Sequence, residues 1–105
     1  MKDSQKIFKI LTLLQWEDFQ KNGVFHGSDI DIKDGFIHLS FENQWQSIWD
    51  KFFNKAEIYL VALHNLDTKL LKIEANKPGG AEYPHYYSEC LTRENIQEVT
   101  KIPAA

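Results

Sequence analysis

The N-terminal part of the chain combines a strand pattern with a helix pattern. Apolar residues on both sides of residues 6 to 11 predict a mostly buried strand rather than an alternating one. Thr12 and Gln15 have the spacing of a capping box, in which the threonine hydroxyl accepts from a backbone N–H and the glutamine reaches back. We therefore expect a helix that runs to about Asn22 and is ended by Gly23.

The next part is predicted to hold a structured loop, a short strand and a second helix. Residues 24 to 35 are rich in Gly, Ser and Asp and end in a Lys-Asp-Gly turn. A strand is expected over residues 36 to 39, and Ser40 is expected to be the N-cap of a helix over about residues 41 to 54. This helix has the most regular apolar stripe in the sequence, which predicts a core-facing helix: Trp45, Ile48, Trp49, Phe52 and Phe53.

The C-terminal half is predicted to be mainly strands. Residues 57 to 64 have a continuous apolar middle, which indicates a strand buried on both faces, and residues 69 to 75 alternate. Residues 76 to 80, Asn-Lys-Pro-Gly-Gly, fit neither a helix nor a strand interior. A short turn or helix around residues 92 to 95 leads to a final strand over residues 96 to 102. Strands interleaved with two main helices predict an α+β fold.

Length, charge and cysteine usage narrow the class of protein. We expect one domain over residues 1–105, because the chain is too short for two ordinary cores. The net charge of -3 and the scattered lysines argue against generic binding to nucleic acids or membrane surfaces. The lone Cys90 excludes an intrachain disulfide and a multi-cysteine zinc site. No signal peptide or apolar run long enough for a bilayer is visible, so a cytoplasmic location is expected.

His38 occupies an informative position in its predicted strand. Alternation places it on the same face as Phe36 and Ser40. If this face looks into the core, the imidazole needs a buried partner, and if it looks into a cleft, it can meet a ligand. Ser40, at the predicted start of a helix, is either a simple N-cap or part of an anion site.

His85 stands in a segment typical of ligand-binding loops. It follows Pro84 and precedes Tyr86 and Tyr87, so a ligand lid and ligand-free aromatic packing are both open interpretations. Glu74 is an acidic candidate nearby. His26, in a glycine-containing loop, is either a ligand contact or a loop histidine held by polar neighbours. No metal is expected, because the histidines are widely separated along the chain.

The segments together resemble the bacterial DUF952 family, a family of unknown function. The resemblance spans nearly the whole chain, and its most specific parts are Gly35-Phe36-Ile37-His38-Leu39-Ser40 and Pro84-His85. Further matches are Ile7-Phe8-Lys9-Ile10-Leu11-Thr12, Trp16, Gly23-Val24-Phe25, Gly27-Ser28, Asp31, Asp34, Glu74, Gly79-Gly80, Tyr83, Tyr86-Tyr87 and Leu91.

This resemblance implies a curved, split, mixed or antiparallel sheet related to that of the ADP-ribosyltransferases, which hold NAD in a central cleft. By that analogy the strand of Lys9 and Thr12, the strand of His38 and Ser40, and residues 74 to 87 converge on the cleft. The chain departs from well-characterised transferases by lacking a Glu-x-Glu pair and an Arg or His-Gly-Thr motif on its first strand.

Two functions are carried forward from these observations. The first is an enzyme that binds NAD or an ADP-ribose-like nucleotide and transfers an ADP-ribosyl group to an acceptor such as a protein. Its expected catalytic residues are His38, His85 and Glu74, and its expected ligand-binding residues are Lys9, Thr12, His26, Ser28, Ser40, Tyr86 and Tyr87. The second is a non-catalytic module that binds a small molecule or a protein, which the absent glutamate pair favours.

Overall fold

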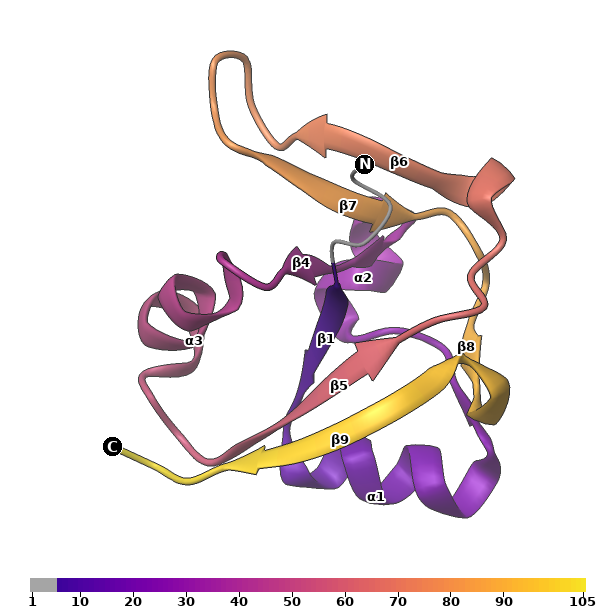
Figure 1. Cartoon of the computed structure of the whole chain (residues 1–105), viewed down its shortest axis with the longest axis vertical. Coiled ribbons are helices and arrows are strands. Elements are labelled where there is room, and N and C mark those ends of the chain that lie inside the picture. The colour runs from indigo at the N-terminus through magenta and orange to yellow at the C-terminus, as the bar shows by residue number, and fades with distance from the viewer. Residues whose placement is uncertain (1–5) are drawn as a thin grey trace.

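Two long antiparallel strands form the centre of the main sheet. The computed structural model describes residues 6–105, and Figure 1 shows how its elements are arranged. Strand β1 (Ile7–Leu11) pairs antiparallel with β5 (Ile58–Leu63) along its whole length. Strands β4 (Ser40–Phe41) and β9 (Ile96–Ile102) complete a four-stranded sheet in the order β4-β1-β5-β9.

A second, three-stranded sheet brings the two candidate histidines side by side. Its order is β3-β7-β6, formed by β3 (Ile37–His38), β7 (Glu82–Tyr86) and β6 (Leu71–Ala75). His38 of β3 is the direct antiparallel partner of His85 of β7. Strands β2 (Val24–Phe25) and β8 (Leu91–Thr92) pair with each other in a third, two-stranded sheet. The described strands therefore pair only antiparallel, within an α+β fold.

Within residues 6–105, three α-helices and two short 3-10 helices connect the strands. Helix α1 (Leu13–Asn22) has the predicted capping box of Thr12 and Gln15, and Gly23 ends it in the left-handed region with φ 78°. Helices α2 (Asp29–Asp34) and α3 (Trp45–Phe53) follow. The 3-10 helices are η2 (Thr68–Leu70) and η3 (Arg93–Asn95). None of the helices formed by the described residues has the length and apolar composition needed to cross a bilayer.

Apolar side chains cover both faces of the main sheet, which confirms the predicted burial of β1 and β5. One cluster includes Leu11, Phe19 and Val61, so it lies where α1 and the other sheets meet the main sheet. The opposite cluster includes Phe8, Ile10 and Leu60 and is covered by α3. Helix α3 packs less deeply than its stripe predicts: none of its residues is buried, and Phe52 is 71% exposed.

The structure corrects two predictions between residues 24 and 41. The expected loop over residues 24 to 35 contains β2 and the short helix α2, whose capping box joins Ser28 to Asp31. Ser40 is not a helix N-cap, because it pairs with Phe8 in β4. Helix α3 instead begins at Trp45 after a turn, and its N-cap makes no side-chain hydrogen bond. Tertiary pairing with β1 therefore prevails over the local capping pattern.

Of the two interpretations left open for the segment around His85, the structure contradicts the ligand lid. Residues 82 to 86 form β7, the middle strand of the three-stranded sheet, with β3 on one side and β6 on the other. His85 is only 2% exposed. A strand hydrogen-bonded on both sides cannot open like a loop, so His85 belongs to a fixed wall.

Thr12→Ala tests the cap of α1. The variant loses the hydrogen bond that the Thr12 hydroxyl accepts from the Gln15 N–H at 3.2 Å, while the Thr12 N–H keeps its acceptor, Gln15 Oε1. We expect the free energy of unfolding in urea to fall by about 1 kcal/mol. The matched variant Thr68→Ala, at an exposed 3-10 position, should change it by less than about 0.5 kcal/mol. Equal losses in both variants would contradict the role of the cap.

Candidate functional site

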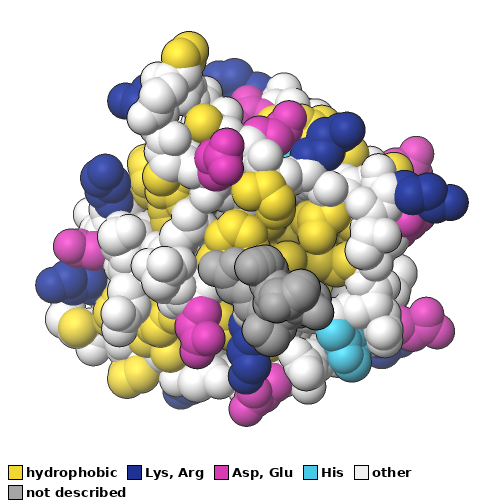
Figure 2. All heavy atoms as spheres, turned by 45° about the horizontal axis from the view of Figure 1, so that its top comes forward, with side chains coloured by type: hydrophobic (Ala, Val, Ile, Leu, Met, Phe, Trp, Pro, Cys, Tyr) yellow, Lys and Arg dark blue, Asp and Glu magenta, His cyan; other side chains and the backbone are white. Residues whose placement is uncertain are grey.

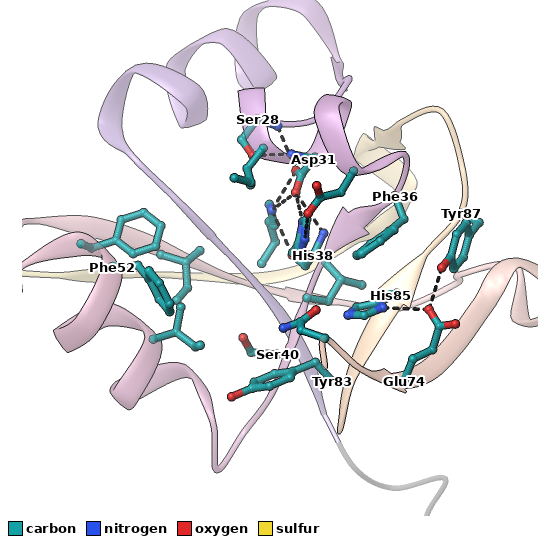
Figure 3. A pocket seen from close by; sticks show the side chains of 18 of the residues that line it. Ser28, Asp31, Phe36, His38, Ser40, Phe52, Glu74, Tyr83, His85 and Tyr87 are labelled. Atoms are coloured by element: carbon teal, nitrogen blue, oxygen red, sulfur yellow. Dashed lines mark hydrogen bonds and ion pairs between the residues drawn. The ribbon is translucent and has the colours of Figure 1, made fainter. Parts of the chain in front are cut away.

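The main pocket lies where β3 and β7 face α2 and α3. Its volume is about 910 Å³, and its polar wall includes Asp31, His38 and His85. Phe52 of α3 lies across the pocket from His85, as Figure 3 shows. The pocket therefore has a polar side built by strands and an apolar side built partly by a helix.

Asp31 is the centre of the polar wall. Its carboxylate accepts from Lys9 Nζ at 2.9 Å and 3.2 Å, from the Ser28 N–H at 2.9 Å and from the His38 N–H at 3.0 Å. His38 Nδ1 lies 2.7 Å from the same carboxylate. Asp31 is 2% exposed and Lys9 is 6% exposed, so this is a buried ion pair whose lone pairs are hydrogen-bonded.

The charged state of this pair follows from its hydrogen bonds. Burial by itself would raise the pKa of Asp31, but the hydrogen bond from His38 and the charge of Lys9 outweigh it and lower the pKa well below its usual range. Burial lowers the pKa of Lys9, and the carboxylate of Asp31 opposes that shift. The pair therefore links β1 to α2, and each buried charge stabilises the ionised form of the other.

His38 has a partner for each of its ring nitrogens. Nδ1 contacts Asp31, and Nε2 lies 3.0 Å from Asp34 Oδ2. Ionised carboxylates only accept hydrogen bonds, so both contacts are satisfied when the ring carries both protons. The contacts fix the orientation of the ring and leave neither nitrogen free for a ligand.

His85 is held on one side only. Its Nδ1 lies 2.8 Å from Glu74 Oε1, and the Tyr87 hydroxyl donates to the same oxygen at 2.6 Å. These bonds from Tyr87 and His85 lower the pKa of Glu74, and the one to Glu74 raises the pKa of Tyr87. Since an ionised carboxylate must receive a proton, Nδ1 is the donor and Nε2 of a neutral ring carries a lone pair. Within the described structure, the buried Nε2 has no partner.

Phe36 packs against both histidines. Its ring centroid is 4.1 Å from that of His85, 4.4 Å from that of His38 and 5.2 Å from that of Tyr87. The two imidazole centroids are 5.8 Å apart. Figure 3 shows these rings together on one side of the pocket. One small ligand can therefore reach both histidine side chains.

The structure brings most of the expected site residues together. Seven of them line the pocket: Lys9, Ser28, His38, Ser40, Glu74, His85 and Tyr87. Three do not. Thr12 caps α1, Tyr86 is buried with its hydroxyl accepting from the Asp67 N–H at 3.0 Å, and His26 lines a smaller pocket of about 290 Å³.

The sequence predictions missed Asp31, Asp34 and Phe36 as parts of the site. Two signals pointed to Asp31: its capping-box spacing from Ser28, and a lysine, Lys9, inside an apolar strand that required a counter-ion. Among residues 6–105, no group of three or more His, Cys, Asp or Glu side chains is arranged to hold a metal ion. The chemistry available to the site is therefore that of its own side chains and of its ligand.

Asp31→Asn tests whether the buried ion pair holds the site together. Removing one charge leaves Lys9 buried without its counter-ion, which should lower the free energy of unfolding by about 3–5 kcal/mol. Adding Lys9→Met should recover much of the loss. The control Asp34→Asn removes only a half-exposed contact and should cost less than about 1 kcal/mol. Urea unfolding measures all four proteins, and equal losses in the two aspartate variants would contradict the assignment.

The same pair predicts a pH dependence. Because the pKa of Asp31 is lower in the folded protein, its stabilisation is present above the ordinary aspartate pKa of about 4 and is lost as the pH falls through the folded-state pKa. The wild type should therefore lose stability progressively below about pH 4. The Lys9→Met and Asp31→Asn double variant should lose less over that range, as measured by urea unfolding at several pH values.

Comparison with known proteins identifies the family. Residues 10–101 match the family described as "Protein of unknown function (DUF952)". The crystal structure of protein CC0527 from Caulobacter crescentus has 35% sequence identity and a TM-score of 0.78, over 91% of this chain and 84% of that chain. Its solution NMR structure has 37% identity and a TM-score of 0.76, over 90% and 82%. No curated protein matches. The chain belongs to the DUF952 family.

Proposed function

We propose that the pocket binds a nucleotide-like small molecule, such as NAD or an ADP-ribose-like compound, in the cytoplasm and that His85 acts on it as an acid or base. The observation that carries this proposal is the unpartnered Nε2 of His85. A buried polar atom without a partner costs stability, and native proteins hold few of them. A ligand hydroxyl that donates to Nε2 supplies the missing partner.

The contacts of His85 are those of an oriented base. Glu74 holds the Nδ1 side of the ring, as carboxylates do in hydrolases where a histidine removes a proton from a nucleophile. Tyr87 in turn holds Glu74. The opposite edge of the ring is directed away from Glu74, toward the pocket, in Figure 3.

The size and lining of the pocket also suit such a ligand. Its volume of about 910 Å³ falls within the range of small-molecule and cofactor sites, which are mostly apolar with a few polar groups. Ile48, Phe52 and Phe53 of α3 offer a surface for a planar ring. Ser40 and Tyr83 add hydroxyl groups to the lining.

A transfer reaction can be written with these residues. In NAD the bond between ribose and nicotinamide breaks, and nicotinamide leaves with the electron pair. A hydroxyl of an acceptor, such as a protein side chain, forms the new bond to the ribose carbon and gives its proton to His85 Nε2. The carboxylate of Glu74, which contacts Nδ1, stabilises the positive charge that the imidazole of His85 gains when Nε2 takes up the proton.

A second candidate function is binding without catalysis. The observation that favours it is the state of His38, whose two nitrogens are both held by carboxylates, so that one histidine rather than two has a free nitrogen. The polar wall then serves to keep the pocket in one shape. Both functions require a ligand, and only the first requires turnover.

Titration with NAD and with ADP-ribose tests the proposal. Calorimetry and ligand-observed NMR should show binding below millimolar concentrations, and chromatography of an NAD incubation should show released nicotinamide if the protein is an enzyme. Binding without release supports the second candidate function. The absence of binding by both compounds at millimolar concentration contradicts the proposed ligand class.

His85→Phe separates a functional role of His85 from a structural one. Phenylalanine keeps the ring stacked on Phe36 and removes the unpartnered Nε2. The free energy of unfolding should therefore change by less than about 1 kcal/mol or rise, while ligand binding falls at least about tenfold, the factor given by 1.4 kcal/mol. The control His64→Phe, at an exposed position, should bind as the wild type does. A large loss of stability with unchanged binding would show a structural role instead.

A further inference from the structure

The ionised groups that line the pocket are predominantly acidic. Among residues 6–105, three carboxylates, those of Asp31, Asp34 and Glu74, line it against one ammonium group, that of Lys9. The lining includes no arginine. Even when His38 carries two protons, the balance stays negative. Elsewhere, on the face shown in Figure 2, basic side chains lie scattered among acidic ones.

The ammonium group of Lys9 makes all of its hydrogen bonds inside the protein. A lysine ammonium group has three donors, and Nζ has three acceptors within reach: both oxygens of Asp31 and the backbone carbonyl of His38 at 2.9 Å. The side chain is only 7% exposed. Lys9 therefore has no donor left for a ligand.

The residues nearest His85 offer acceptors rather than donors. The Tyr87 hydroxyl gives its proton to Glu74, and His85 gives its Nδ1 proton to the same carboxylate. What remains for a ligand is the lone pair of His85 Nε2 and the second oxygen of Glu74. Asp34 adds another acceptor, because one of its oxygens contacts His38 and the other has no partner among the described side-chain hydrogen bonds.

Acceptors of this kind pair with hydroxyl or amino groups. An ionised phosphate brings only acceptors and negative charge, so it finds neither a donor nor a counter-charge among these groups. The neutral hydroxyls of Ser40 and Tyr83 and the neutral amides of Gln15 and Asn76 also line the pocket. They can donate to oxygen atoms of a ligand without offsetting its charge.

We infer that the His85 end of the pocket, formed by buried His85 and the partly exposed side chains of Asp34, Glu74 and Tyr87, binds an unphosphorylated hydroxyl or amino group and excludes phosphate. This inference rests on the proposed function and specifies the ligand class further. The group at His85 is an uncharged or cationic nucleoside or sugar end. Any phosphate of the ligand lies outside the His85 end.

Matched pairs of compounds that differ by one phosphate test this selectivity. The pairs are adenosine with its 5′-phosphate, and nicotinamide riboside with its 5′-phosphate, measured by calorimetry at pH 8 and low salt. Each nucleoside should bind at least about tenfold more tightly than its phosphorylated partner, a ratio equivalent to 1.4 kcal/mol. Equal or tighter binding of the phosphorylated members overturns the inference.

Glu74→Gln locates the source of the selectivity. It replaces a carboxylate of the His85 end with a neutral amide. The ratio of nucleoside to nucleotide affinity should therefore shrink at least about threefold, which corresponds to less than about one kcal/mol. The matched variant Glu82→Gln, an exposed residue of β7 outside the pocket lining, should keep the wild-type preference. Equal changes in both variants would trace the selectivity to net charge and overturn the inference.

The outcomes also separate this inference from the proposed function. If NAD or ADP-ribose binds and the phosphorylated compounds are preferred, the proposed function stands and the selectivity inference falls. If none of the compounds binds, including NAD and ADP-ribose, the proposed function falls and the inference falls with it.

Discussion

The buried contact between Lys9 and Asp31 is the interaction on which the polar half of the molecule depends. Lys9 comes from the central strand of the main sheet, and Asp31 comes from a helix too short to be stable by itself. Asp31 also binds the backbone and the ring of His38, which belongs to the second sheet. One carboxylate thus joins a strand of the main sheet, a short helix and a strand of the second sheet, and the polar wall of the pocket is built around it.

The two histidines of the site occupy equivalent positions in their strands but have different hydrogen-bond partners. They are direct partners across adjacent strands, and their rings lie close together. His38 has a carboxylate at each ring nitrogen, whereas His85 has a carboxylate at Nδ1 and a buried, unpartnered Nε2. Both positions hold a histidine, so the difference comes from the neighbouring carboxylates, which leave a ring nitrogen without a partner only in His85.

Local patterns were sufficient for the parts of the fold that local physics decides. The capping box at Thr12, the stop at Gly23 and the doubly buried strand of residues 58 to 63 depend on near neighbours or on composition, and each is readable in the sequence. Ser40 was misplaced because its cap pattern competes with pairing to β1, a contact between distant residues. The central place of β7 also depends on partners far along the chain.

The candidate site, like the fold, could be predicted from the sequence only in part. Residue types and a family resemblance drew attention to Glu74, His38 and His85, but the missing partner of Nε2 is a property of three-dimensional packing that no spacing encodes. Asp31 was hidden because it reads as a polar residue of a loop. An isolated lysine in an apolar strand is the kind of local contradiction that can reveal such a residue.

Phe36 has a consequence for how protons move in this site. Its ring packs against both imidazoles and carries no group that can donate or accept a proton. The two imidazole centroids lie 5.8 Å apart with the rings edge to face, and the described hydrogen bonds of both rings go to carboxylates rather than to each other. Nε2 of His85 therefore has no described protein group with which to exchange a proton, and any exchange at this atom has to take place with a molecule that enters the pocket.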